Sequence, residues 1–242
     1  MQQWFEGFAA DFKQSFIDAD RWQALLSGLG TTLLITVLAL VLGVVLGVLV
    51  AVVRSSYDQK KKKGGVLGIL NKLCYVYITV IRGTPMMVQL LIMYFVIMAS
   101  STNTVLVATL SFGINSGAYL AEIIRGGIMA VDKGQSEAGR SLGLSYVQTM
   151  RFIVIPQAVK TILPALGNEL IALLKETSIV NVIGMKDITK WAINVQGRTY
   201  QAFMPFIGIA AVYLILVIIL TKLVSMMERR LANDGTAKRH NN

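Results

Sequence analysis

The sequence has little charge for its length. Of its 242 residues, 15% are charged and 55% are hydrophobic, whereas a soluble domain usually carries about 25% charged residues. Several long stretches hold no charge, and the mean hydropathy of the whole chain is +0.62. This composition excludes an ordinary water-soluble domain and indicates a membrane protein. At about 20 residues for each membrane-spanning helix, the chain is too short for a large many-helix transporter.

Residues that carry chemistry are also scarce. Cys74 is the single cysteine and lies in an apolar run, so it forms no internal disulfide and is interpreted as a buried thiol. His240 is the single histidine and lies in a polar C-terminal stretch, which excludes histidine-based catalysis. No run fits the ATP-binding Walker A pattern, GxxxxGK followed by Ser or Thr. We therefore expect no enzyme active site, no metal and no cofactor in this chain.

Apolar runs predict an all-α integral membrane protein with five transmembrane helices. The first run is the clearest, because it holds no charge and is long enough for the ~30 Å hydrocarbon core. Gly43 and Gly47 within it have the GxxxG spacing that lets another helix approach closely. The second run is interrupted by Arg82-Gly83-Thr84-Pro85, which is either a bend or a plain packing feature. The predicted runs are 33–53, 73–99, 105–131, 152–174 and 203–227.

The excess of basic residues predicts the orientation in the membrane. The formal net charge is +10, but there is no platform of alternating basic and aromatic residues, so nucleic acid is not an expected partner. Lys and Arg instead gather in the segments 54–72, 133–151 and 229–239. Because such residues accumulate on the cytoplasmic side, we expect the N-terminus outside and the C-terminus in the cytoplasm.

Composition also divides the chain. Residues 1–27 lack the pattern of a secretory signal, and phenylalanines recur in them at helical spacing, so we expect an amphipathic segment on the outer membrane interface. Packing of this segment against the first span is the alternative. We expect residues 28–230 to form the transmembrane domain and residues 231–242 to form a polar cytoplasmic tail.

A cytoplasmic loop at 132–156 has the signals of two short helices. Asp132 is expected to cap the first, with Gln135 as its capping partner, and Ser145 to cap the second, with Gln148 in the same relation. Gly143 stands where a helix end favours a left-handed residue. A short charged helix held between two spans is suited to contact another protein.

The same loop resembles a known motif. Glu137-Ala138-Gly139, then Gly143, then Ile153-Val154-Ile155-Pro156 is similar to the EAA motif of permease subunits in bacterial ATP-binding-cassette (ABC) importers. Gly139 and Ile155 depart from it, because alanine and leucine are usual there. Further segments resemble the polar amino-acid permeases of the histidine/arginine/glutamine type. These segments are 81–85, 116–127, 141–144, 155–158 and 174–178.

The resemblance implies a fold, partners and a location. The fold would be that of a type I ABC importer permease, in a bacterial cytoplasmic membrane. The partners would be a second permease copy or a paralogue, two ATPase subunits that bind ATP and Mg²⁺, an extracytoplasmic solute-binding protein, the amino-acid substrate and membrane lipid. The cytoplasmic helix would be a coupling helix that docks on an ATPase subunit. Its expected contact residues are Glu137, Ala138, Gly139, Arg140 and Gly143.

Polar residues within the spans are candidates for the substrate pathway, because polar groups at membrane depth usually face a cavity or a partner. Glu122 and Arg125 are three residues apart and could simply neutralise each other. Glu169 either faces the pathway or pairs with Lys160 or Lys175. An acidic group in the pathway favours a basic substrate such as arginine, histidine or lysine, with glutamine or another neutral amino acid as the alternative. The candidates are Asn115, Glu122, Asn168 and Glu169.

Other functional classes fit less well. An ion-coupled secondary transporter usually has internal repeats with broken helices in both halves, and no repeat is visible here. An intramembrane enzyme would need paired aspartates, an HExxH zinc motif or a serine–histidine pair within the spans, and the sequence has none of these. Both classes rank below an ATP-driven importer.

Overall fold

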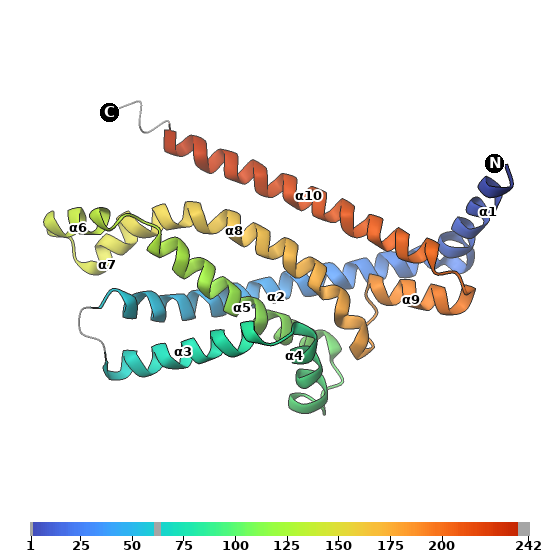
Figure 1. Cartoon of the computed structure of the whole chain (residues 1–242), viewed down its shortest axis with the longest axis horizontal. Helices are drawn as coiled ribbons and strands as arrows, with labels where there is room; N and C mark the ends of the chain where they lie inside the picture. The colour runs from blue at the N-terminus through green and yellow to red at the C-terminus, as the bar shows by residue number, and fades with distance from the viewer. Residues whose placement is uncertain (1, 61–63, 237–242) are drawn as a thin grey trace. The chain divides into compact units, whose positions relative to one another are not determined.

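The computed structural model describes residues 2–60 and 64–236, and this part of the chain consists of helices and short connections without a β-strand (Figure 1). The polar tail predicted at 231–242 is described only as far as residue 236. Five helical segments are long and apolar enough to cross a membrane, which confirms the all-α, five-span prediction. They are Glu6–Asp58, Gly65–Gly83, Thr104–Met129, Tyr146–Ile183 and Phe203–Leu231.

The N-terminal segment is separated from the first span by a break. Helix α1 (Gln2–Phe12) continues into a π turn, and α2 (Arg21–Asp58) begins after a 3-10 turn. Ala19 and Asp20 in that turn have positive φ angles of 56° and 52°. The 38 residues of α2 extend beyond a ~30 Å hydrocarbon core at ~1.5 Å per residue. The predicted apolar run 33–53 therefore covers only the middle of this helix.

The second span differs from its prediction. Helix α3 (Gly65–Gly83) begins before the expected run 73–99, and the rest of that run is a separate short helix, α4 (Met86–Ile92), followed by a π turn. Thr84 is extended, with φ −120° and ψ 145°. The residue before a proline avoids the helical region, and Pro85 itself lacks an N–H group. The prediction of one span over 73–99 was therefore wrong, and the interruption is a true break between helices.

The remaining elements follow the predicted order. The third and fifth spans begin within a residue or so of their expected starts, and the fourth is α8, which keeps Pro164 inside it. The elements are α5 (Thr104–Met129), α6 (Lys133–Ser141), α7 (Tyr146–Thr149), α8 (Ile155–Glu176), α9 (Ile188–Thr199) and α10 (Phe203–Thr236).

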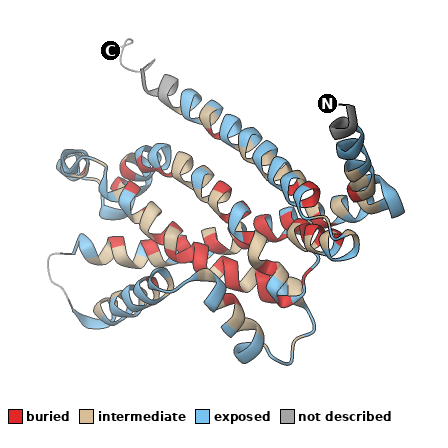
Figure 2. Cartoon of the chain, turned by 45° about the vertical axis from the view of Figure 1, so that its right-hand side comes forward, coloured by how far each residue is buried: buried red, intermediate tan, exposed pale blue. Residues whose placement is uncertain are grey.

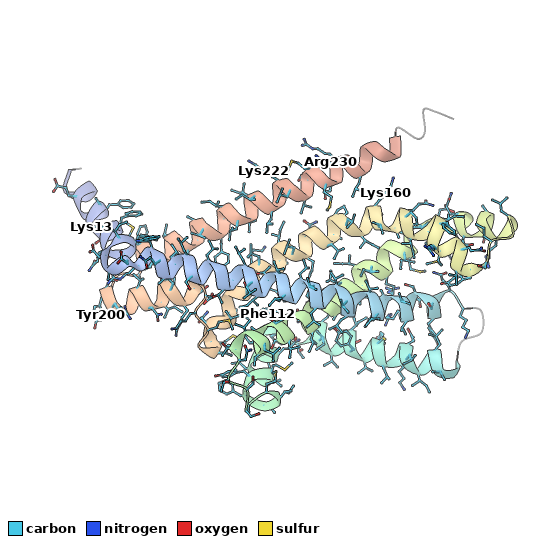
Figure 3. The ribbon with its side chains drawn as sticks, turned by 180° about the vertical axis from the view of Figure 1, so that it is seen from behind. Lys13, Phe112, Lys160, Tyr200, Lys222 and Arg230 are labelled. Carbon is cyan, nitrogen blue, oxygen red and sulfur yellow. The ribbon has the colours of Figure 1, made fainter. Side chains whose placement is uncertain are left out.

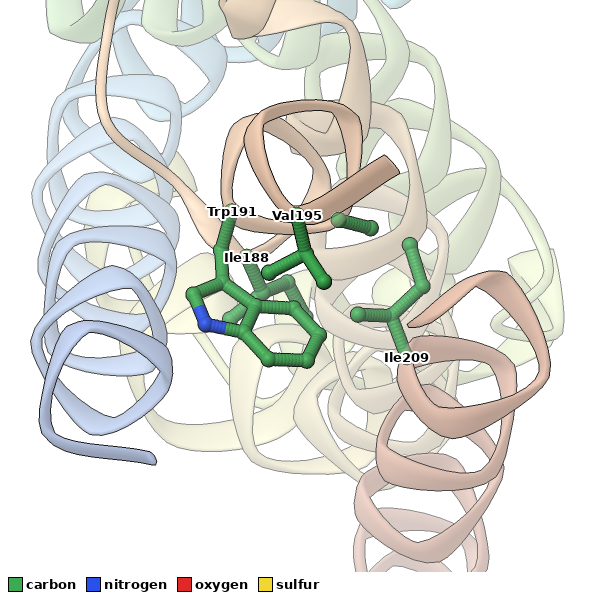
Figure 4. Close-up of a cluster of buried hydrophobic side chains, with 5 residues drawn as sticks. Ile188, Trp191, Val195 and Ile209 are labelled. Carbon is green, nitrogen blue, oxygen red and sulfur yellow. The ribbon is translucent and has the colours of Figure 1, made fainter. Parts of the chain in front are cut away.

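The chain forms two compact units. The first comprises 1–39, 86–112 and 172–219. Its core lies where α9 meets the first turns of α10, around Ile188, Trp191, Val195 and Ile209 (Figure 4). The ring of Phe16 lies 5.2 Å from that of Trp191, whose Nε1 donates to the backbone carbonyl of Arg21 at 2.8 Å. These contacts join the π turn that follows α1 to α2, α9 and α10 within this unit.

The second unit comprises 40–85, 113–171 and 220–242, and glycines bring α2 and α5 together in it. A Cβ atom added at Gly43 would lie 3.1 Å from Ser116, and one at Gly47 would lie 2.7 Å from Leu120. From the other side, a Cβ at Gly117 would lie 2.9 Å from Leu46. The close approach predicted from the GxxxG spacing is confirmed, and its partner is α5.

The helices differ in how much of their surface they bury. Buried residues run along much of α5, whereas α3 and α10 are exposed over most of their length (Figure 2). The exposed face of α3 is apolar, with Val66 at 74% and Leu73 at 62% exposure. Such a face suits contact with lipid or with another membrane subunit.

Candidate coupling and translocation sites

Helix α6 begins at a side-chain cap. Asp132 accepts a hydrogen bond from the backbone N–H of Gly134 at 2.6 Å, as predicted. The predicted role of Gln135 in this cap is wrong, because its side-chain oxygen instead accepts from Gln157 Nε2 at 3.3 Å. That contact ties the start of α6 to the first turn of α8. The cap satisfies one of the N–H groups that a helix start leaves free.

Helix α6 ends in a left-handed glycine. Gly143 has φ +81°, and its N–H donates to Arg140 O at 2.9 Å, while the N–H of Leu144 donates to Gly139 O at 3.1 Å. This pair of bonds is the Schellman motif. Two residues on, Ser145 and Gln148 form the predicted capping box, with bonds of 2.8 and 3.3 Å. The end of α6 and the start of α7 are therefore both fixed.

Gly139 departs from the usual alanine of the motif, and its packing explains why. It is the buried residue of α6. A Cβ atom at this position would lie 2.8 Å from Ile153 Cδ1 and 3.1 Å from Thr149. Ile153 belongs to the second half of the same motif. The spacing between the two halves thus places α6 directly against the segment that leads into α8.

The other predicted contact residues of α6 face outward. Glu137, Ala138 and Arg140 are exposed, and so is Gly143. Glu137 and Arg140 also border a cleft of about 330 Å³ that reaches the ends of α2 and α5. A partner that docks on α6 would therefore meet both exposed charged side chains and a cleft.

In the spans, the structure connects Glu169 of α8 to α5. Ser116 Oγ donates to Glu169 Oε1 at 2.9 Å. Among the ion pairs of the described chain, none joins Glu169 to Lys160 or Lys175. Asn115 is buried beside Ser116 on α5, whereas Asn168 is exposed on α8. Glu169 therefore has a hydroxyl as a hydrogen-bond partner and forms no ion pair in the described part of the chain.

Glu122 has different surroundings. Its carboxylate pairs with Arg125 at 3.1 Å and lies 3.8 Å from Arg54. Arg125 also pairs with Asp58 at 3.3 Å. Mutual neutralisation of Glu122 and Arg125, one of the two alternatives, is confirmed. The pathway candidates therefore fall into two groups. Glu169 bonds to Ser116, which is next to Asn115 in the sequence. Glu122 belongs to a network of ion pairs between α2 and α5.

The family model of the binding-protein-dependent transport system inner membrane component matches residues 65–233. This range includes α6, both halves of its motif and the Ser116–Glu169 bond. The chain belongs to this family of permeases. Its members are transport subunits and not enzymes, and this permease is a multi-pass membrane protein.

Relatives of the permease are amino-acid transport proteins. It is 39% identical over 183 residues to a putative glutamine transport system permease protein GlnP of Rickettsia bellii, covering 69% of this chain and 84% of the relative. It is 39% identical over 186 residues to the arginine transport system permease protein ArtQ of Bacillus subtilis, covering 71% and 85%. This permease is accordingly a subunit of an amino-acid ABC importer.

Solved structures show the same fold. The permease superposes on the crystal structure of an amino acid ABC transporter with histidines at a TM-score of 0.78 and 43% identity, covering 86% of this chain and 94% of the other. An inward-facing MetNI methionine ABC transporter matches at a TM-score of 0.76 but 17% identity, covering 89% and 99%. The second likeness is one of fold alone. The permease has the type I ABC importer fold that its motifs implied.

Several notable residues of the permease were missed at the level of sequence. Leu142 and Val147, beside α6, are 81% and 69% exposed, and they are not among the contact residues expected from the sequence. Ser116 lies in an apolar run, and nothing local marks it as the partner of a residue on another span. The basic residues near α9 lie outside the basic segments that predict the orientation, and the sequence gives them no role beyond the net charge.

Proposed function

We propose that this permease forms half of the translocation path of an ATP-driven importer that carries a polar amino acid, preferably a basic one, across a bacterial cytoplasmic membrane. The N-terminus lies outside, and the C-terminus and α6 lie in the cytoplasm. The observation that carries this proposal is α6, a nine-residue helix fixed at both ends between two spans, with its charged residues exposed.

Coupling depends on the rigidity of α6. A helix of this length is unstable on its own, so its caps and its contact with Ile153 hold it in shape. ATPase subunits dock on Glu137, Ala138 and Arg140 and move α6 as they close. ATP and Mg²⁺ are bound by those subunits, because this chain has no Walker A run.

The complete importer contains two permease chains, this one with a second copy or a paralogue, and two ATPase subunits. An extracytoplasmic solute-binding protein delivers the amino acid, in keeping with the family description of a binding-protein-dependent system. The exposed apolar faces of the spans leave room for the second permease chain and for lipid.

Glu169 supports a basic substrate. An acidic group within the membrane that bonds to a hydroxyl and forms no ion pair in the described part of the chain is a suitable partner for a cationic side chain. The relative named for arginine transport fits this preference. The relatives named for glutamine transport favour a neutral amino acid as the second candidate.

The test is uptake of radiolabelled arginine and glutamine by proteoliposomes that contain the permease, its ATPase subunits and its binding protein. We expect uptake to require ATP inside the vesicles and to persist when a protonophore removes the proton gradient. Uptake that needs no ATP and collapses with the protonophore would instead identify an ion-coupled transporter.

A further inference from the structure

A basic groove lies in the first unit, between the first turns of α2 and helix α9. It has a volume of about 420 Å³. Gly28 lets α2 approach closely, because a Cβ atom there would lie 2.9 Å from the backbone of Asp187. Trp191 and Val195 form part of its wall. The cations that line it are Arg21, Lys186, Lys190 and Arg198.

The acidic residue of the groove does not neutralise these cations. Asp187 is 1% exposed and caps α9, accepting hydrogen bonds from the N–H groups of Thr189 at 3.0 Å and Lys190 at 2.9 Å. Burial raises its pKa, although these hydrogen bonds oppose the rise. In the described part of the chain, no ion pair involves any of the four cations. The groove therefore presents unneutralised positive charge.

The polar residues of α9 form a row. Lys190, Asn194 and Arg198 follow one another at four-residue intervals, which places them on one face of the helix. At ~1.5 Å per residue this row is ~12 Å long. A single lipid phosphate would engage only one end of such a row. A protein segment with several carboxylates matches its whole length.

Tyr200 stands at the end of the row, where α9 gives way to α10 (Figure 3). It is 91% exposed and has φ +57°, a left-handed conformation that is unusual for an aromatic residue. Its N–H donates to Gln196 O at 2.8 Å, and the side chain of the next residue, Gln201, donates to Asp11 at 2.7 Å. These bonds fix the chain on either side of the exposed ring. Tyrosine and arginine are both enriched among the residues that dominate binding at protein interfaces.

We propose that the basic groove and Tyr200 dock an acidic surface segment of the extracytoplasmic solute-binding protein. This inference rests on the proposed function, which places α6 in the cytoplasm. Helix α6 precedes the span α8 and α9 follows it, so α9 lies outside. Basic residues are disfavoured on that side of a membrane protein. A cluster of them there, none of which forms an ion pair in the described part of the chain, is consistent with a binding role.

The experiment measures how tightly the binding protein associates with the importer in nanodiscs of phosphatidylcholine. Lys190→Glu combined with Arg198→Glu should weaken binding by about tenfold or more, mainly by slowing association, and should reduce its sensitivity to salt. Tyr200→Gly, which keeps the left-handed conformation and removes the ring, should also weaken binding. Lys13→Glu is the matched control, because Lys13 is exposed on the same side but lies outside the groove.

The outcomes separate this inference from the function it rests on. Unchanged affinity in the double variant, while wild-type uptake still requires the binding protein, overturns the docking site and leaves the function standing. A double variant that loses only a dependence on added phosphatidylglycerol makes the groove a lipid site and likewise overturns the inference. Wild-type uptake without any need for a binding protein overturns the proposed function itself. Assembly with the ATPase subunits, checked by size-exclusion chromatography, shows that each variant folds.

Discussion

The carboxylate of Glu169 accepts a hydrogen bond from the hydroxyl of Ser116 at 2.9 Å. Ser116 in turn lies where Gly43 brings the backbone of α2 against α5. The position of the acidic group on α8 therefore depends on a neighbour on α5, whose own environment is set by a glycine on α2. A change of charge at residue 169 can be made without disturbing this packing.

Glu169→Gln makes that change. The amide oxygen of glutamine still accepts the hydrogen bond from Ser116, but the negative charge is lost, so we expect the affinity for arginine to fall by about tenfold, as for the loss of one charge-assisted hydrogen bond. Uptake of glutamine should change little. The measurement is competition by arginine, histidine and glutamine in reconstituted transporter, with Glu169→Asp as the charge-retaining control. The same order of preference in wild type and Glu169→Gln would remove Glu169 from the pathway.

At the scale of elements, α6 has its boundaries set by local bonds at both ends. Asp132 starts the helix and Gly143 ends it, and neither depends on a distant part of the chain. Side chains that reach across to other elements then fix where the helix lies, through Gly139 against Ile153. The shape of α6 and its position can therefore be perturbed separately.

Gly143→Val tests the shape. A β-branched residue with φ near +81° is strained by about 1–2 kcal/mol, so the end of α6 should fray and fewer amino acids should be imported for each ATP hydrolysed. Gly143→Asn is the matched control, because asparagine tolerates the left-handed region. Uptake and ATP hydrolysis are measured in the same proteoliposomes. If Gly143→Val transports as many molecules per ATP as Gly143→Asn, α6 does not transmit the coupling motion.

Features of these elements that depend on neighbouring residues can be predicted from the sequence, and features that depend on distant residues cannot. The caps at Asp132 and Ser145 and the turn at Gly143 were predictable, because each rests on residues within a few positions of one another. The start of α3 was not, because Asn71 and Lys72 separate its first residues from the apolar run that begins at Leu73. Contacts between distant segments were not predictable, because no local pattern marks the two residues as partners. Ser116 and Glu169 are separated by 53 positions. Arg21 is likewise far in sequence from the cations of α9 with which it lines the groove.

At the scale of the whole molecule, five spans require the two ends of the chain to lie on opposite sides of the membrane. The same count places α6 and α9 on opposite sides, since one span, α8, separates them. The assignment of the ATPase subunits to α6 and of the binding protein to α9 depends on which of the two helices lies in the cytoplasm. The distribution of Lys and Arg is the basis for placing α6 in the cytoplasm.

Cysteine labelling checks this orientation. In a Cys74→Ser background, which leaves no other cysteine, we expect a membrane-impermeant maleimide added to intact spheroplasts to label Lys186→Cys. Lys133→Cys should react only after the membrane is permeabilised. Both parent lysines are exposed, so access to the reagent, and not burial, decides the result. The reverse pattern would invert the topology and exchange the sides assigned to the ATPase and the binding protein.

The glycine contacts between α2 and α5 have a mechanical consequence. Leu42 and Leu46 of α2 lie over Gly113 and Gly117 of α5, each within 2.9 Å of where a Cβ atom would be. If one helix slid along the other, these leucines would collide with residues that have side chains. We therefore expect this stretch of α2 and α5 to move as one rigid body during transport. The distance between spectroscopic probes on these two helices should therefore stay constant during transport. It would serve as a reference for measuring the motion of the other spans.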